Sequence, residues 1–180
     1  MAVSLQIINP WEYKNWDDLV CLQKEYSFFH SSAWAQVICD SYNYNPLYFI
    51  LINRKELQAV IPLVEVKSFL TGHRGVSLPF SDYCEPIMGQ GIDATDVIDS
   101  IINYGKKAGW DHIEFKTTKK FHNKLEPSQY FYKHFLNLSE NENTTFNSFH
   151  EGTRRNIKRA IKNGVTTCTS HSFDSVKEFY

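Results

Sequence analysis

The feature that most constrains the fold is a pair of apolar segments, at residues 46–52 and 57–66, separated by a short polar stretch. Both segments are rich in β-branched and aromatic residues, which favour extended strands. The polar stretch at 53–56 is short enough to be a hairpin turn. We therefore expect two antiparallel strands here, followed by a further strand at 70–78 that two glycines interrupt.

The segments on either side of the hairpin add helices and further strands. Apolar residues at helical spacing predict helices at 16–24, after Ser31 or Ser32, and between Asp93 or Thr95 and Gly109. Extended segments are expected at 4–8, 111–116 and 130–138. This order predicts a mixed α/β (α+β) fold in which most of the antiparallel pairing comes early.

The composition changes near Ser139, where a polar stretch at 139–143 is typical of a linker. We therefore expect one domain at 1–140, and at 141–180 a linker, a basic helix and the start of a second, similar domain. The basic helix is expected to begin at Thr144 or Thr145 and to run to about Asn163, where Gly164 ends it.

A β-type segment at 165–170 and a last helix from Ser172 or Asp174 complete the chain. A helix of seven or eight residues is unstable alone in water, so its apolar side chains need a surface to pack on. The sequence therefore predicts a chain truncated shortly after its second domain begins.

The basic helix carries a cationic face made of Arg154, Arg155, Lys158, Arg159 and Lys162. Phe149, Ile157, Ala160 and Ile161 are expected to line the other face. Like charges at this spacing repel one another, so an anion would stabilise them. Two interpretations remain open: a solvated helix face, or a site for a phosphorylated or nucleic-acid ligand, whose oxygens arginine binds in pairs. The net charge of −1 is unlike that of a dedicated nucleic-acid module.

The remaining composition indicates a cytoplasmic protein. The first residues lack the apolar run of a signal peptide, and no segment has the roughly 20 apolar residues of a membrane span. The cysteines, at positions 21, 39, 84 and 168, are too far apart for a zinc motif and are expected to be free thiols. No metal motif, Ser-His-Asp set or pair of catalytic carboxylates is readable from the spacing, so a hydrolase is unsupported.

Three segments together resemble the FemAB-like branch of the GNAT acetyltransferase superfamily. They are FFHSSAW at 28–34, AVIPL at 59–63 followed by GHRGVSLPFSDY at 72–83, and TRRNIKRA at 153–160 with Gly164 and Val165 after it. The resemblance implies tandem GNAT-like domains, each a mixed sheet flanked by helices. It also implies transfer of an acyl or aminoacyl group to an amine on a peptidoglycan (cell-wall) precursor or another acceptor, bound between the first domain and the basic helix.

The chain departs from the family pattern at the donor site. By this resemblance the rest of the second domain is expected to be missing, and no glycine-rich loop that would hold the pyrophosphate of coenzyme A at a helix N-terminus is readable from the sequence. The triplet GQG at 89–91 is better explained as a turn. We therefore expect this fragment to bind no cofactor, and the full-length protein to use acyl-CoA or aminoacyl-tRNA as donor.

Acyl transfer to an amine needs a group that binds the amine and accepts its proton. Asp82 is the candidate catalytic acid, although it could equally cap a turn. Candidate substrate-binding residues are His73, Arg74, Tyr83, Arg154, Arg155 and Lys158. His73 also has a purely structural interpretation, and Trp34 is expected in the core.

Two hypotheses for function follow. The first is an acyltransferase fragment that binds a small-molecule or phosphorylated cell-wall-type acceptor. The second is a non-catalytic module whose basic helix binds tRNA or another polyanion. In either case, self-association through the exposed, unfinished domain is expected.

Overall fold

The expected hairpin forms the centre of a six-stranded sheet in the computed structural model, which describes residues 5–54, 56–81, 84–118, 126–132 and 134–179. The chain divides into two compact units, Met1–Gln129 and Tyr130–Tyr180. The boundary expected from the sequence lies between 140 and 141. The second unit therefore begins earlier than expected and includes residues 130–140.

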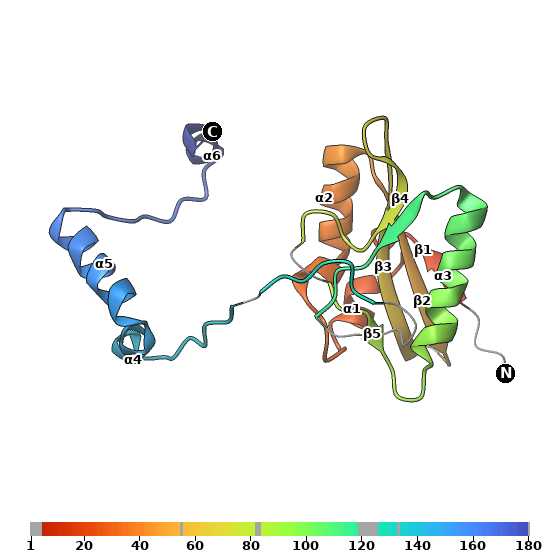
Figure 1. Ribbon diagram of the computed structural model, residues 1–180, viewed down its shortest axis with the longest axis horizontal. Helices are drawn as coiled ribbons and strands as arrows, with labels where there is room; N and C mark the ends of the chain where they lie inside the picture. The colour runs from red at the N-terminus through yellow and green to blue at the C-terminus, as the bar shows by residue number, and fades with distance from the viewer. Residues whose placement is uncertain (1–4, 55, 82–83, 119–125, 133, 180) are drawn as a thin grey trace. The chain divides into compact units, whose positions relative to one another are not determined.

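The sheet of the first unit is mixed (Figure 1). Its strands are β1 (Leu5–Ile8), β2 (Asn45–Asn53), β3 (Glu56–Ser68), β4 (Gly72–Val76), β5 (Ile87–Met88) and β6 (His112–Glu114). The order is β1-β2-β3-β4-β6, with antiparallel pairs except for the parallel pair β4–β6. β2 occupies one edge of the long strand β3, so β4 and β5 share its other edge, at residues 64–68 and 59–60 respectively.

Helices cover both faces of this sheet. On one face lie α1 (Trp16–Val20), a 3-10 helix η1 (Phe28–His30) and α2 (Ser32–Tyr42), and on the other lies α3 (Ala94–Ala108) (Figure 1). Side chains alternate along a strand, so Tyr48 and Ile50 pack toward α1 and α2 while Phe49 and Leu51 pack toward α3. The fold class expected from the sequence, a mixed sheet flanked by helices, is therefore confirmed.

The helix ends in this unit follow local sequence signals. Ser31 caps α2 by accepting a hydrogen bond from the Trp34 backbone N–H (3.2 Å), and Asp93 caps α3 in the same way. Gly109 ends α3 with a left-handed φ of 76°. The helix expected at 16–24 is wrong in length and ends at Val20. Its apolar contacts stop there, since the next apolar residue, Leu22, is 81% exposed.

The second unit contains α4 (Glu142–Ser148), α5 (Glu151–Lys162) and α6 (Phe173–Phe179). The single long helix expected from Thr144 or Thr145 is wrong. Asn141 caps α4, and α4 and α5 are separate helices because Phe149 is extended and the His150 ring accepts the Gly152 N–H (3.2 Å) as a new cap. Phe149 therefore does not belong to the α5 face.

The strands expected at 130–138 and 165–170 are absent from the described residues of those segments. A strand needs a neighbour to pair its backbone N–H and C=O groups, and the described part of this unit offers none. None of the residues of α4, α5 and α6 is buried. Within the described residues, every helix is too short or too polar to cross a bilayer.

Candidate functional site

The loop between β4 and β5 carries the sequence SLPFSDYCEP at 77–86. Asp82 and Tyr83 lie outside the residues that the structure describes, and hydrogen bonds anchor the residues on both sides of them. The Ser77 N–H donates to the Glu114 carbonyl (2.8 Å), and the Ser77 hydroxyl accepts from the Lys116 N–H (2.7 Å). The Cys84 N–H donates to the Lys116 carbonyl (2.8 Å), so both arms of the loop are fixed to the segment that continues β6.

The first arm of this loop holds its backbone in an unusual conformation. Leu78 and Phe80 both have left-handed φ angles, 51° and 63°, although neither is glycine. Each costs on the order of 1 kcal/mol. The Ser81 hydroxyl donates to the Leu78 carbonyl (2.7 Å) and helps to hold this conformation. Strain of this kind persists where the surrounding structure enforces it, often at functional segments.

The conformation buries Leu78 and turns the Phe80 ring outward. Phe80 is 57% exposed and stacks on Tyr42 of α2, with ring centroids 4.4 Å apart. Tyr42 in turn stacks on Tyr44, at 5.5 Å. Three aromatic rings therefore stand beside the arm that leads to Asp82. Two of them, Phe80 and Tyr42, are exposed.

A buried histidine holds the other arm. The His30 Nδ1 accepts the Ser27 N–H (3.1 Å), so its Nε2 carries the proton and donates to the Glu85 carbonyl (2.9 Å). Burial lowers the pKa of His30 despite these hydrogen bonds, which keeps the ring neutral. The Trp16 indole N–H donates to the His30 carbonyl (2.8 Å) and fixes the residue further.

Cys84 lies next to this histidine, with its Sγ 3.5 Å from the His30 Nε2. The pair differs from a nucleophilic Cys–His site because the histidine donates its proton elsewhere. Burial, and then the nearby Glu85, raise the pKa of the Cys84 thiol far above its usual range. Cys84 is therefore a core thiol, and the role of His30 is to position the loop.

His73 and Arg74 lie within β4, where they pair with Lys67 and Val66 of β3. The His73 Nε2 is 2.8 Å from the Glu65 Oε1, which also accepts the Trp110 indole N–H (3.0 Å). Arg74 donates from Nη1 to the Thr71 carbonyl (2.9 Å). Both side chains are bound locally, and neither is brought together with the described residues of the β4–β5 loop.

Glu65 is the centre of its own polar cluster. Burial alone would raise the pKa of Glu65, but the hydrogen bonds from Trp110, His73 and Asn45 and the charge of Lys67 outweigh it and lower the pKa to about 2. Glu65 is thus a charged residue that fastens β3, β4 and the segment after α3 to one another. Its role is structural.

Arg154, Arg155 and Lys158 lie on α5 of the second unit. Arg155 and Lys158 are exposed, Arg154 is half-buried, and the Lys158 Nζ is 5.9 Å from the centre of the Phe146 ring. The cationic face predicted from the sequence is therefore present along this helix.

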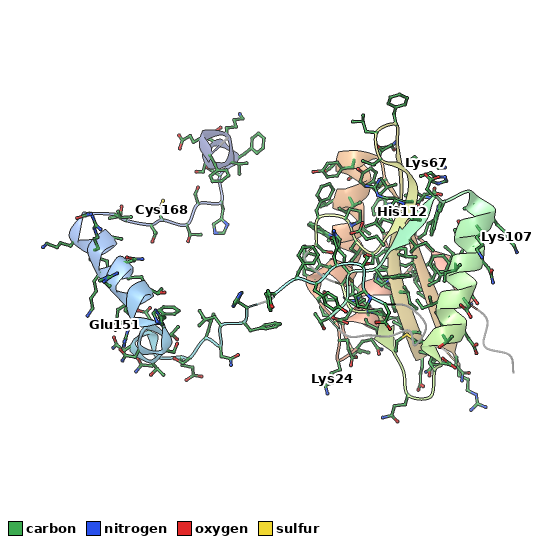
Figure 2. The ribbon with its side chains drawn as sticks, viewed as in Figure 1. Lys24, Lys67, Lys107, His112, Glu151 and Cys168 are labelled. Carbon is green, nitrogen blue, oxygen red and sulfur yellow. The ribbon has the colours of Figure 1, made fainter. Side chains whose placement is uncertain are left out.

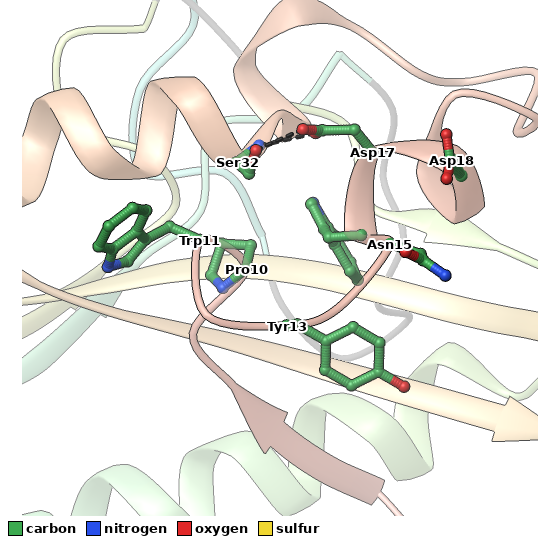
Figure 3. A pocket seen from close by; sticks show the side chains of 8 residues that line it. Pro10, Trp11, Tyr13, Asn15, Asp17, Asp18 and Ser32 are labelled. Atoms are coloured by element: carbon green, nitrogen blue, oxygen red, sulfur yellow. Dashed lines mark hydrogen bonds between the residues drawn. The ribbon is translucent and has the colours of Figure 1, made fainter.

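An open pocket of about 290 Å³ lies elsewhere on the first unit, between the segment after β1 and the start of α2 (Figure 3). Trp11 and Tyr13 line it beside Asp17 and Asp18. Asp17 is committed to the start of α2, because its two carboxylate oxygens accept the backbone N–H (2.8 Å) and the hydroxyl of Ser32. The pocket was not predicted from the sequence, since its residues form no recognised motif.

His30 and Lys116 are the site residues that sequence reasoning missed. The Lys116 Nζ donates to the Ser81 carbonyl (3.3 Å) and lies 3.8 Å from the Glu114 carboxylate, beside the first arm of the loop. Lys116 had no sequence signal. His30 had one, because it is the histidine of the FFHSSAW segment.

The first unit is thus a mixed α/β fold with a strained, firmly anchored loop at the carboxyl end of two parallel strands. No protein-family model and no curated protein matches the sequence. Among the solved structures that are similar to the fold are two acetyltransferases. One is a ribosomal-protein-alanine N-acetyltransferase from Brucella melitensis biovar Abortus, with 10% identity, 74% of this chain and 100% of that chain covered, and a TM-score of 0.47.

The other is a GNAT family acetyltransferase from Staphylococcus aureus, with 10% identity, 75% of this chain and 100% of that chain covered, and a TM-score of 0.43. At this distance neither neighbour assigns a role to any residue of this chain. Within the part of the chain that the structure describes, no three His, Cys, Asp or Glu side chains are grouped to hold a metal ion.

Proposed function

We propose that this chain is the acceptor-binding part of a FemAB-like N-acyl- or aminoacyltransferase, acting in the cytoplasm on an amine of a cell-wall precursor. One observation supports the proposal above the others. The hydrogen bond from His30 to the Glu85 carbonyl joins one segment that resembles the family, FFHSSAW, to the β4–β5 loop, two residues after the end of another, GHRGVSLPFSDY. A histidine 55 positions away in sequence thus holds this loop in place.

In the proposed chemistry, the β4–β5 loop binds the acceptor. The Asp82 carboxylate binds the acceptor amine and takes its proton as the nitrogen attacks the donor carbonyl. A C–N bond forms and the bond from the acyl carbon to sulfur, or to the ribose oxygen of tRNA, breaks. The proton then passes to the leaving thiolate or alkoxide. Acyl-CoA or aminoacyl-tRNA supplies the acyl group, from a donor site outside this chain.

Replacing Asp82 with asparagine tests this assignment. A hydrogen bond to a charged partner contributes about 1.5–3 kcal/mol, so Asp82→Asn should weaken binding of an amine-bearing, phosphorylated cell-wall peptide precursor roughly 10- to 150-fold. Isothermal titration calorimetry would measure this. Asp93→Asn is the matched control, since asparagine caps α3 as well as aspartate does. Equal affinity of Asp82→Asn and the unmodified chain would refute the role of Asp82.

The cationic face of α5 supports a second candidate, binding of tRNA or another polyanion. Each phosphate contact adds roughly 0.7 to the slope of log affinity against log salt for a single strand. Replacing Arg154, Arg155 and Lys158 with alanine should therefore reduce that slope by about 2 in RNA-binding titrations. A slope and affinity unchanged by the triple substitution would leave α5 a solvated helix and remove this candidate.

A further inference from the structure

The β3–β4 hairpin ends in a tip whose two large apolar side chains stand in solvent. Phe69 is fully exposed and Leu70 is 88% exposed. Isolated apolar residues on a surface are common, but two adjacent ones at the end of a hairpin form a small apolar head. Neither belongs to the core clusters on the two faces of the sheet.

The tip is held in shape by its own polar groups. The Ser68 hydroxyl accepts the backbone N–H groups of Leu70 (3.2 Å) and Thr71 (3.3 Å). The guanidinium of Arg74 donates to the Thr71 carbonyl (2.9 Å). At the base of the hairpin His73 binds Glu65 (2.8 Å) across the two strands. The apolar pair is thus presented by a preorganised turn.

The hairpin also projects beyond its neighbours. β2 stops pairing with β3 at Asn45 opposite Glu65, and β6 reaches β4 only as far as Arg74. The His73 carbonyl still accepts the Asp111 N–H (2.7 Å), and from the next pair, Ser68–Gly72, outward the hairpin is two-stranded, as the loop beyond the β4 label shows (Figure 1). The apolar head is convex and narrow.

This shape favours a lipid surface over a protein partner. A stable protein interface needs about 800 Å² on each side with matched shape, which two side chains on a projecting tip do not supply. A bilayer deforms around such a tip, and its interfacial region accepts aromatic and aliphatic side chains.

Two cations flank the tip. The Lys67 side chain is 66% exposed in this part of the unit (Figure 2), and its Nζ is 3.5 Å from the Glu65 Oε2. An exposed ion pair of this kind contributes little, so the lysine can exchange Glu65 for a lipid phosphate. The half-buried Arg74 lies on the opposite strand, and the other carboxylate at the base, Asp111, accepts the His73 backbone N–H (2.8 Å). Cations next to inserted apolar residues strengthen binding to anionic lipids.

We propose that Phe69 and Leu70 insert into the interfacial region of an anionic membrane while Lys67 and Arg74 contact lipid phosphates. The interaction is weak and reversible, because two side chains bury less apolar surface than a single myristoyl chain, which itself binds only marginally. It would place the first unit on a membrane surface without a spanning helix. The proposal stands independently of the acyltransferase assignment.

Vesicle sedimentation of the full chain tests the proposal. The vesicles are phosphatidylcholine alone, or phosphatidylcholine with phosphatidylglycerol. Phe69→Ser combined with Leu70→Ser should lower the partition coefficient at least tenfold on the anionic vesicles. Leu22→Ser is the matched control, because it removes an equally exposed leucine outside the hairpin and should leave the coefficient unchanged.

Phe69→Trp supplies a second readout that does not depend on losing binding. Its added emission, measured against the four native tryptophans of the unmodified chain, should shift to the blue and be quenched by brominated lipids. Vesicle binding that the serine double variant keeps in full would overturn the proposal and assign the contact to another surface. A lack of vesicle binding by the unmodified chain would overturn it as well.

Two further outcomes would assign the tip to a protein surface and overturn the lipid proposal. One is a concentration-dependent dimer in size-exclusion chromatography that the serine double variant abolishes. The other is faster proteolysis of residues 130–180 in that variant, which would identify the second unit of the chain as the occupant.

Discussion

Replacing His30 with alanine is expected to lower the free energy of unfolding of the Met1–Gln129 unit by about 3 kcal/mol. The ring is completely buried, so its removal leaves a cavity. It also leaves the Ser27 N–H and the Glu85 carbonyl without their hydrogen-bond partner. Urea unfolding followed by tryptophan fluorescence measures the change, since Trp16 donates to the His30 carbonyl and reports on this part of the core.

The same substitution should loosen the β4–β5 loop selectively. The Cys84 amide, which donates to the Lys116 carbonyl, should exchange its hydrogen much faster. The exchange of the β2 amides should speed up only as far as the loss of global stability requires. His112→Ala is the control, because His112 is exposed and its loss should change stability by less than about 0.5 kcal/mol. A loss below 1 kcal/mol for His30→Ala would contradict the anchoring role.

The parts of the fold that the sequence predicted are those set by local chemistry. The β2–β3 hairpin follows from two apolar runs around a polar turn, and α2 and α3 follow from the caps at Ser31 and Asp93. Each of these signals lies within a few residues of the structure that it specifies. Hydrogen bonds and burial inside one segment are enough to decide such elements.

Elements that depend on a distant partner were not predictable in the same way. The parallel pairing of β4 with β6 joins segments that are 38 positions apart at Gly75 and Ile113, with α3 between them. The apolar pattern at 130–138 resembles a strand, but no described neighbour pairs with it. Period-2 alternation predicts a strand only where another strand completes its hydrogen bonds.

The candidate site shows the same limit. His73 and Arg74 are adjacent in sequence, yet neighbours in a strand point to opposite faces of the sheet. His73 joins Glu65 and Trp110 on the α3 face, whereas Arg74 pairs with Val66, which packs in the α1–α2 core. His30, which does hold the loop, belongs to the FFHSSAW segment, but its role depends on a contact with Glu85, 55 positions away in sequence.

Gly75→Ala is the second substitution with a large expected effect, about 2 kcal/mol of destabilisation. Gly75 lies opposite Glu65 in the sheet, and a Cβ there would come within 2.3 Å of the Trp110 ring. The ring cannot move away freely, because its N–H is bound to Glu65 (3.0 Å) and Tyr104 packs edge-on against it (5.4 Å between centroids). Gly152→Ala is the control, since its Cβ would meet nothing closer than 3.4 Å.

A double-mutant cycle with Trp110→Leu isolates the cause. Trp110→Leu alone should destabilise the unit, because the indole hydrogen bond to Glu65 and much of the packing between α3 and the sheet are lost. In that background the smaller side chain leaves room for a methyl group, so Gly75→Ala should cost about 1 kcal/mol less than it does beside the native tryptophan. Equal costs in the two backgrounds, measured by urea unfolding, would show that the requirement for glycine comes from the backbone of β4 and not from Trp110. The non-positive φ of Gly75 argues for the ring, because alanine fits that backbone without strain.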